Sequence, residues 1–514
     1  MKVNGLSETS NESGGGREPK TVNEIFDQAT QEEESGDRWL SSDLSKALRF
    51  YQRAYSLYMQ ALNIDVSHLD TRYNASRLLF TVYTEYIKNE GVNLTDLNNC
   101  DLALSRTDAS VIQPLQNICQ FFQISLELVS QASSRFAWDL YYNAALCYFE
   151  YVEEETRNGY ETMAQFSQVM DAMQISQRLL SSALQYQVKE LKQFTEKVGK
   201  AEPIIHSEVP TARDTIAEIE DTILPSTVLE TCLNCYRLVS TSYEDSWSEE
   251  RLSLVANASD EFINVVDSIS SGLLDNYTNS SNEIVPSLTE DEINELKITK
   301  ISFLASKSLT FAECEAVWQS EPLLDLVDKL LLEAGSYRTL LDKLDESLAV
   351  VDDKLKWQVL SVMDTKYKEC YKVLKKQLDQ LKKRSVEDTG DDKSNIISQI
   401  CSVFIEQADI EVERSMLESG QKYHDVLVKN SYNLLKNSLV YSKQGGGLRE
   451  SVSGKLVREK RRRETLARLC ILDGKLSRTE LSSIVGANYW PQEMSDLADV
   501  SVYSEGAKSA LTQA

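Results

Sequence analysis

Apolar residues recur at three- and four-residue spacing from Thr21 to about Tyr441, with short polar stretches between the runs. This spacing predicts a succession of amphipathic helices, each with one apolar face. Thr21 with Glu24, and Thr289 with Glu292, form the capping-box pattern that opens a helix. The chain has only eight prolines in 514 residues, so few helix interiors are interrupted. We therefore predict an all-α fold.

The polar stretches divide this pattern into parts. Residues 1–20 are rich in Ser, Glu and Gly and are predicted to be a disordered tail. Helical repeats are expected over 21–275, with a domain boundary in the polar stretch 276–292. The remaining parts are a second helical domain (287–441) with two long helices around 338–385 and 394–441, a Gly-rich flexible linker (443–454), and a basic helix, a short helix from Ser477 and a loose C-terminal tail (455–514).

The stretch "NIDVSHLD" (63–70) lies between two such helices. Before it, Ala54, Tyr58 and Ala61 share one helix face, where small residues allow a neighbouring helix to approach closely. The following helix carries Tyr73 and Ala75 on its apolar side. The pattern predicts two packed helices joined by a short turn.

This junction resembles the boundary between two tetratricopeptide repeats, a helix pair with a 34-residue period. The residues that match are Ala54, Tyr58, Ala61, Ile64, Asp65, Tyr73, Asn74 and Ala75. A second match is "WDLYYNAALCYF" (138–149), 69 residues after the first when Tyr142 is compared with Tyr73 (142 − 73). Val66 stands where the repeat favours proline, and residues 89–109 are an insert. The resemblance covers about residues 21–245 and implies a tetratricopeptide-like helical-repeat array that binds protein segments in a groove.

The resemblance also implies candidate binding residues. Asn74 and Asn143 occupy the position that often faces the groove, although they could equally be solvated residues of a polar helix face. Asp70 and Asp139 stand where repeats that clamp the carboxylate ends of chaperones have lysine. A negative charge there would repel a carboxylate and favour a basic or neutral partner.

The net charge of −26 indicates which classes of partner the protein is expected to bind. Phosphates would be repelled over most of the surface, so no direct contact with nucleic acid is expected. A basic segment of a protein is a better client, although acidity can also serve solubility alone.

One segment is basic, in contrast to the acidic chain as a whole. In "KLVREKRRRETLARL" (455–469), Lys460, Arg461, Arg462 and Arg463 form a candidate nuclear-import signal. The segment could also fold back onto the acidic body, or be a solvated helix face over Leu456, Leu466 and Leu469.

Candidate chemistry is scarce in this sequence. The three histidines lie far apart, and Cys232-Leu-Asn-Cys235 lacks the second ligand pair of a zinc site. We predict no catalytic residues, metal or cofactor. The N-terminus lacks a secretory signal and no run is apolar enough to span a membrane, which favours a cytoplasmic or nuclear protein with reduced thiols.

These patterns favour a non-enzymatic binding scaffold, adaptor or dedicated chaperone with a protein partner, with a basic client as one hypothesis. The alternative is a permanent structural subunit of a larger complex, which would expose large apolar patches when isolated. The identity of the partner and the oligomeric state stay open.

Overall fold

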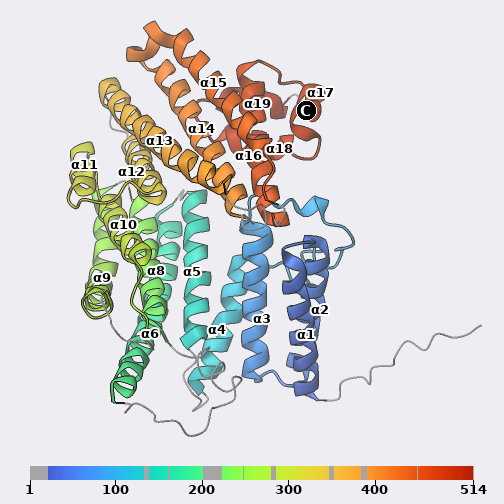
Figure 1. Cartoon of the computed structure of the whole chain (residues 1–514). Helices are drawn as coiled ribbons and strands as arrows, with labels where there is room; N and C mark the ends of the chain where they lie inside the picture. The colour runs from blue at the N-terminus through green and yellow to red at the C-terminus, as the bar shows by residue number, and fades with distance from the viewer. Residues whose placement is uncertain are drawn as a thin grey trace, which may run out of the picture. The chain divides into compact units, whose positions relative to one another are not determined.

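The computed structural model describes residues 21–131, 138–159, 162–200, 223–246, 248–278, 285–346, 352–383, 391–447 and 450–512. Throughout these ranges the chain forms helices joined by turns, and they contain no strand (Figure 1). The all-α prediction is confirmed. The predicted tail at 1–20 lies outside the described residues.

Contacts divide the chain into two compact units, and the division differs from the predicted boundary at 276–292. The first unit holds Met1–Val82 and Leu97–Gln113. Its helices are α1 (Val22–Leu40), α2 (Leu44–Ile64) and α3 (Leu69–Val82). Helix α2 packs against both α1 and α3, and Ala54, Tyr58 and Ala61 are fully buried in it. The helix–turn–helix predicted around residues 63–70 is present.

Part of the predicted insert closes over α2 in the first unit. The Gln52 side chain donates to the Ala109 carbonyl oxygen (2.8 Å) and accepts from the Val111 amide (2.9 Å). The Tyr55 hydroxyl donates to the Asp108 carbonyl oxygen (3.2 Å). These bonds give hydrogen-bond partners to backbone groups of residues 108–111 and hold this segment against α2.

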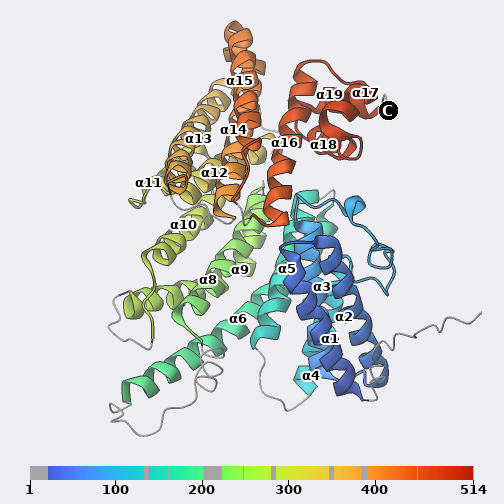
Figure 2. The same cartoon turned by 45° about the vertical axis from the view of Figure 1, so that its right-hand side comes forward.

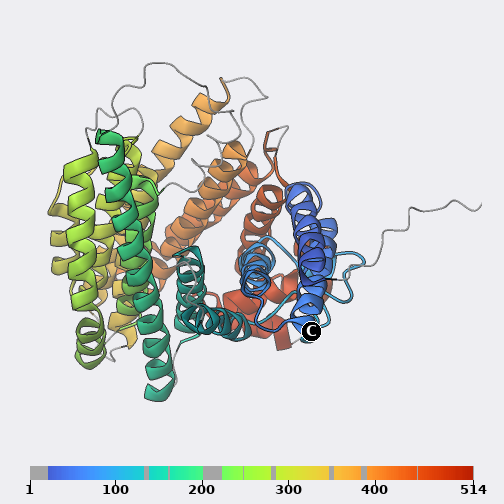
Figure 3. The same ribbon diagram turned by 90° about the horizontal axis from the view of Figure 1, so that it is seen from below.

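The second unit holds Tyr83–Asp96 and Pro114–Ala514. Its first part contains η1 (Tyr83–Lys88), η2 (Leu94–Asp96), α4 (Leu115–Gln131), α5 (Trp138–Asn158), α6 (Met163–Lys200), α8 (Pro225–Glu244), α9 (Glu249–Tyr277), α10 (Glu290–Ser306), α11 (Phe311–Gln319) and α12 (Val327–Glu346). Helix α5 packs on α4 and α6, and α8 packs on α6, α9 and α10 (Figure 3). Helix α10 also packs against α12, so packed helices form a continuous series from α4 to α12.

The two long helices predicted at 338–385 and 394–441 are each two helices. They are α12 and α13 (Asp353–Leu381), and α14 (Asp392–Met416) and α15 (His424–Ser442). The Asp352 side chain caps α13 by accepting from the Lys354 amide. After α14 the chain turns through Gly420, where a side-chain carbon would overlap the Arg414 carbonyl. Helices α13, α14 and α15 lie side by side (Figure 2).

The prediction of a loose tail after the short helix from Ser477 is wrong, because the apolar residues of this part form a core. The elements are α16 (Val452–Leu472), α17 (Arg478–Leu481), η5 (Ser482–Gly486), α18 (Trp490–Ala498) and α19 (Ser504–Thr512). Leu481, Trp490, Met494 and Tyr503 are buried together. The predicted short helix from Ser477 begins there with a capping box.

The described residues of the predicted linker 443–454 are held by specific bonds. The Ser451 amide donates to the Asp391 carboxylate (2.6 Å), and the Ser394 hydroxyl donates to Glu450 (2.6 Å). Composition indicated flexibility, but these side chains fix the start of α16.

The segment 83–96 belongs to the second unit and contacts α16. Glu90 pairs with Arg461 (2.7 Å), and the Asn89 amide donates to the Ser453 hydroxyl (2.8 Å). Gly91 lies against the backbone of Leu456 and Val457, where any side chain would overlap it. A segment from early in the sequence is therefore part of the packing of α16.

Candidate functional site: an acidic cleft in the second unit

A cleft of about 750 Å³ opens among α8, α10 and α12, with one residue each from α5 and α13. Six carboxylates line it: Glu153, Glu244, Asp291, Glu292, Glu295 and Asp328. Among the described residues of the lining, Arg237 is the one cation, and its guanidinium already pairs with Glu295 (2.7 Å). The cleft therefore carries a formal charge of −5 (one positive minus six negative) from these side chains.

Half of these carboxylates come from the start of α10. Thr289 accepts from the Glu292 amide (3.2 Å), and the Glu292 carboxylate accepts from the Thr289 amide (2.7 Å). This capping box confirms the helix start expected from the sequence. Acidic residues are favoured in a first helical turn because they face the positive end of the helix dipole. Asp291 and Glu292 of this first turn both line the cleft.

Apolar side chains form the rest of the lining. Ile298 and Val327 are buried, Leu326 and Leu331 are half-buried, and Leu332 is 41% exposed. Lysine and arginine have aliphatic stems that pack on apolar surface while the charged end stays with carboxylates. The chemistry of the cleft fits such side chains.

Glu244 is the carboxylate most affected by its surroundings. It is accessible from the cleft, yet nearby protein desolvates it and raises the pKa of its carboxyl. Lys343 opposes that shift, whereas Glu153 adds to it. A cation that entered the cleft would favour the ionised form of Glu244 and so release a proton on binding.

Lys343 lies behind Glu244 and is buried. Its Nζ donates to the Ser306 carbonyl oxygen (2.5 Å). Burial lowers the pKa of Lys343 to about 8, against the opposing effect of Glu244. This lysine is a buried cation whose charge is only partly compensated.

Replacement of Lys343 by Met should remove a pH dependence of stability. The folded pKa is about 8 and the unfolded value is 10.5, so between these values only the unfolded state holds the proton. The free energy of unfolding of the native chain should therefore rise by about 3 kcal/mol across this window relative to Lys343→Met. Urea unfolding of both proteins at several pH values tests this. A difference that does not change with pH would contradict it.

The groove residues predicted from the repeat resemblance lie outside this cleft. The Asn74 amide donates to the Asp70 carbonyl oxygen (2.8 Å), and the Asn143 amide donates to the Asp139 carbonyl oxygen (2.9 Å). Each asparagine thus bonds its own helix. Asp70 is exposed and Asp139 is half-buried. Asn74 and Asp70 belong to the first unit and the other two to the second, and their role in partner binding stays a prediction.

The predicted nuclear-import signal lies on α16, where every one of its cations has a carboxylate partner. The pairs are Lys460 with Glu493 (3.2 Å) and Asp496 (2.9 Å), Arg461 with Glu464 (2.8 Å) and Glu90 (2.7 Å), Arg462 with Glu459 (3.4 Å), and Arg463 with Glu493 (3.4 Å). The Arg462 side chain is 44% exposed, whereas that of Lys460 is 10% exposed. An import receptor would have to break these pairs, and the import role stays a prediction.

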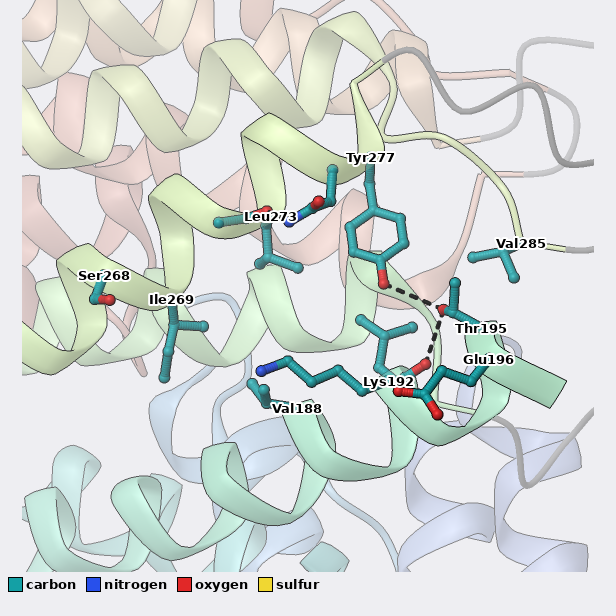
Figure 4. Close-up of a pocket in the computed structure, with 12 residues that line it drawn as sticks. Val188, Lys192, Thr195, Glu196, Ser268, Ile269, Leu273, Tyr277 and Val285 are labelled. Atoms are coloured by element: carbon teal, nitrogen blue, oxygen red, sulfur yellow. Dashed lines mark hydrogen bonds between the residues drawn. The ribbon is translucent and has the colours of Figure 1, made fainter. Parts of the chain in front are cut away.

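A second cavity of about 480 Å³ lies between α6 and α9 (Figure 4). Val188, Leu191, Ile269 and Leu273 supply aliphatic walls. The hydroxyls of Thr195 and Tyr277 are 3.2 Å apart and join the two helices. This cavity is less charged than the acidic cleft, which is therefore the stronger candidate for a binding site.

The two cysteines of the CxxC sequence lie on the buried side of α8. Cys232 and Cys235 are fully buried, and burial raises the pKa of Cys232 to about 12. Within the described ranges, no group of three or more His, Cys, Asp or Glu side chains could hold a metal ion. No helix in the described part of the chain is both long and apolar enough to cross a bilayer.

Sequence reasoning missed the cleft, because its carboxylates come from four helices. One signal was visible: the run "TEDEINE" (289–295) contributes three of them. Glu153, Glu244 and Asp328 had no local signal that set them apart from other surface acids.

Comparison with known proteins gives two kinds of match. Residues 323–499 match the family described as YNL193W C-terminal domain. "Uncharacterized protein YNL193W" of Saccharomyces cerevisiae is 22% identical over 508 residues, covering 86% of this chain and 87% of the relative. "UPF0656 protein C926.02" of Schizosaccharomyces pombe is 42% identical over 64 residues, covering 12% of this chain and 14% of the relative.

Proposed function

We propose that the chain is a non-enzymatic protein-binding scaffold, adaptor or dedicated chaperone, and that its acidic cleft holds a basic segment of a client protein. The observation that carries this proposal is the lining of the cleft. Six carboxylates and a single, already paired arginine surround an apolar surface. The tetratricopeptide-like resemblance of residues 21–245 is consistent with a binding role, and we place the protein in the cytoplasm, the nucleus or both.

The charge of the cleft would act on both rate and specificity. Carboxylates in a concave surface focus their field, which steers cationic segments toward the cleft and makes association sensitive to salt. Apolar contacts with Leu331 and Leu332 would add affinity for segments that place aliphatic groups beside lysine or arginine. An acidic segment would be rejected by repulsion.

A permanent structural subunit is the second candidate. Leu304, Leu324 and Leu332 are 46%, 56% and 41% exposed. Side chains of this kind would be covered in a fixed assembly. The isolated chain should then self-associate at micromolar concentration in sedimentation velocity, whereas an adaptor should sediment as one species.

Removing charge from the cleft should weaken binding of a basic peptide. The probe is a synthetic peptide that alternates lysine with leucine, titrated by calorimetry. The variant Glu244→Gln/Asp291→Asn/Asp328→Asn removes three cleft charges that have no ion pair among the described residues. At about 0.5–1 kcal/mol each, their loss should weaken binding by roughly 10- to 150-fold.

The matched control is Asp171→Asn/Glu261→Gln/Asp275→Asn, which removes the same charges from exposed positions outside the cleft. It should bind the peptide about as tightly as the native chain. Equal weakening in both variants, or tight binding that survives the cleft substitutions, would rule out the cleft as the binding site.

A further inference from the structure

Helix α15 carries a row of exposed lysines that lies outside the acidic cleft and has no part in the function proposed above. Four lysines recur every seven residues along α15 and the residues that flank it: Lys422, Lys429, Lys436 and Lys443. Val426, Asn433 and Val440 alternate with them at steps of three and four residues. All seven positions are exposed, with Val426 at 59% and Val440 at 62%. We call this set the lysine stripe.

The lysine stripe lies opposite the packed side of α15. The buried residues of the helix are Leu427, Ser431, Leu435, Ser438 and Ser442, which face α14 and α16. At about 100° per residue, the part of the stripe from Val426 to Val440 falls on the other side of the helix. Figure 1 shows α15 beside α14.

The lysines of the stripe have no carboxylate partner among the described residues, whereas the basic cluster Lys460–Arg463 of α16 is paired throughout. Lys436 lies over the Tyr432 ring (4.5 Å) and Lys422 over the Tyr423 ring (4.7 Å). Asp425 is the single acidic residue of α15. In a chain with a net charge of −26, this exposed face carries four lysines that have no ion pair among the described residues.

We propose that the lysine stripe binds an acidic amphipathic helix of a partner protein. Steps of three and four residues are the spacing by which two helices keep one seam in contact over several turns. The two valines would pack in that seam. The lysines recur about every 10 Å along the axis, within reach of glutamates at the same repeat on the partner.

Other occupants fit this surface less well. A second copy of the chain would place lysines against lysines in an α15–α15 contact, which is repulsive. A membrane-surface helix needs a wide apolar face with Trp, Phe or Leu, whereas this stripe is narrow and is interrupted by Asn433. Phosphates of nucleic acid would meet the lysines but gain nothing from Val426 and Val440, and most of the chain repels them.

The test uses the full chain and a synthetic helical peptide with leucine at the seam positions and glutamate beside them. Its binding is followed by fluorescence anisotropy. Lys429→Glu/Lys436→Glu should weaken binding by at least about tenfold, because two attractive contacts become repulsive. Val426→Ser/Val440→Ser should weaken it by roughly three- to tenfold through lost apolar burial.

The control is Lys372→Glu/Lys376→Glu, an equal charge change at two exposed positions of α13. Binding unchanged by this control, and by the three-charge cleft variant, is the expected result. Equal weakening by both lysine pairs would show attraction to net charge alone and overturn the proposal. Absence of peptide binding, with vesicles containing phosphatidylserine bound through Lys429 and Lys436, would overturn it in favour of a membrane.

Discussion

Replacement of Arg468 by Ala should lower the free energy of unfolding by about 3–5 kcal/mol, which is the usual effect of leaving one member of a buried ion pair alone. The guanidinium of Arg468 on α16 makes two-point contact with Asp409 on α14, with both nitrogen–oxygen distances at 2.9 Å. The side chains are 12% and 9% exposed. In the variant, the Tyr503 hydroxyl (2.8 Å) would be the remaining hydrogen-bond donor to Asp409 among the described residues, for a charge that water hardly reaches. Urea unfolding followed by circular dichroism measures the loss.

Two further variants test whether the loss of stability comes from the unpaired, buried charge of Asp409. Asp409→Leu/Arg468→Met removes both charges and should be more stable than Arg468→Ala, because no lone charge is left in the interior. Arg462→Ala breaks an exposed pair on the same helix and should change the free energy of unfolding by less than about 1 kcal/mol. A similar small effect for Arg468→Ala would mean that the Asp409 site is hydrated.

Replacement of Trp490 by Ala should cost about 3–5 kcal/mol and release the C-terminal helices. Trp490 is 4% exposed and packs with Leu481, Met494 and Leu497 in the core beneath α16. Its loss leaves a cavity too large for neighbouring side chains to fill. Amide hydrogen exchange of residues 478–512 should speed up strongly, whereas exchange in α1–α3 should not change.

The control for this substitution is Trp39→Ala in the first unit, where the side chain is 37% exposed. It should change stability by far less. If residues 478–512 already exchange fast in the native chain, the C-terminal core is not stable and the sequence-based prediction of a loose tail would stand.

Features that depend on neighbouring residues were predictable from the sequence. The caps at Thr21 and Thr289 were predicted correctly because a capping box is formed within four residues, and the short helix predicted from Ser477 also begins there. The all-α class followed from the helical spacing of apolar residues. The breaks within 338–385 and 394–441 were missed because they depend on Asp352 and Gly420, whose neighbours alone do not indicate a turn.

Features that depend on distant contacts were not predictable. The basic segment 455–469 gave no sign of which cations would be buried, since Glu493 and Asp409 lie in other elements. The cleft is a similar case, because Glu153 and Asp328 converge only in the folded chain. The seven-residue recurrence of Lys429 and Lys436 was visible in the sequence, but only the packing of α15 establishes that it faces outward.

The place of segment 83–96 beside α16 also bears on how the chain is made. Glu90 and Arg461 are 371 residues apart, so at ordinary rates of synthesis the segment leaves the ribosome roughly 20–75 s before its partner. During that interval the ribosome has not yet synthesised Leu456 and Val457, the residues against which Gly91 packs in the folded protein. The second unit can therefore reach its native state only after translation has passed α16. Truncations that end before α16 should leave residues 83–96 open to proteolysis and to recognition by general chaperones.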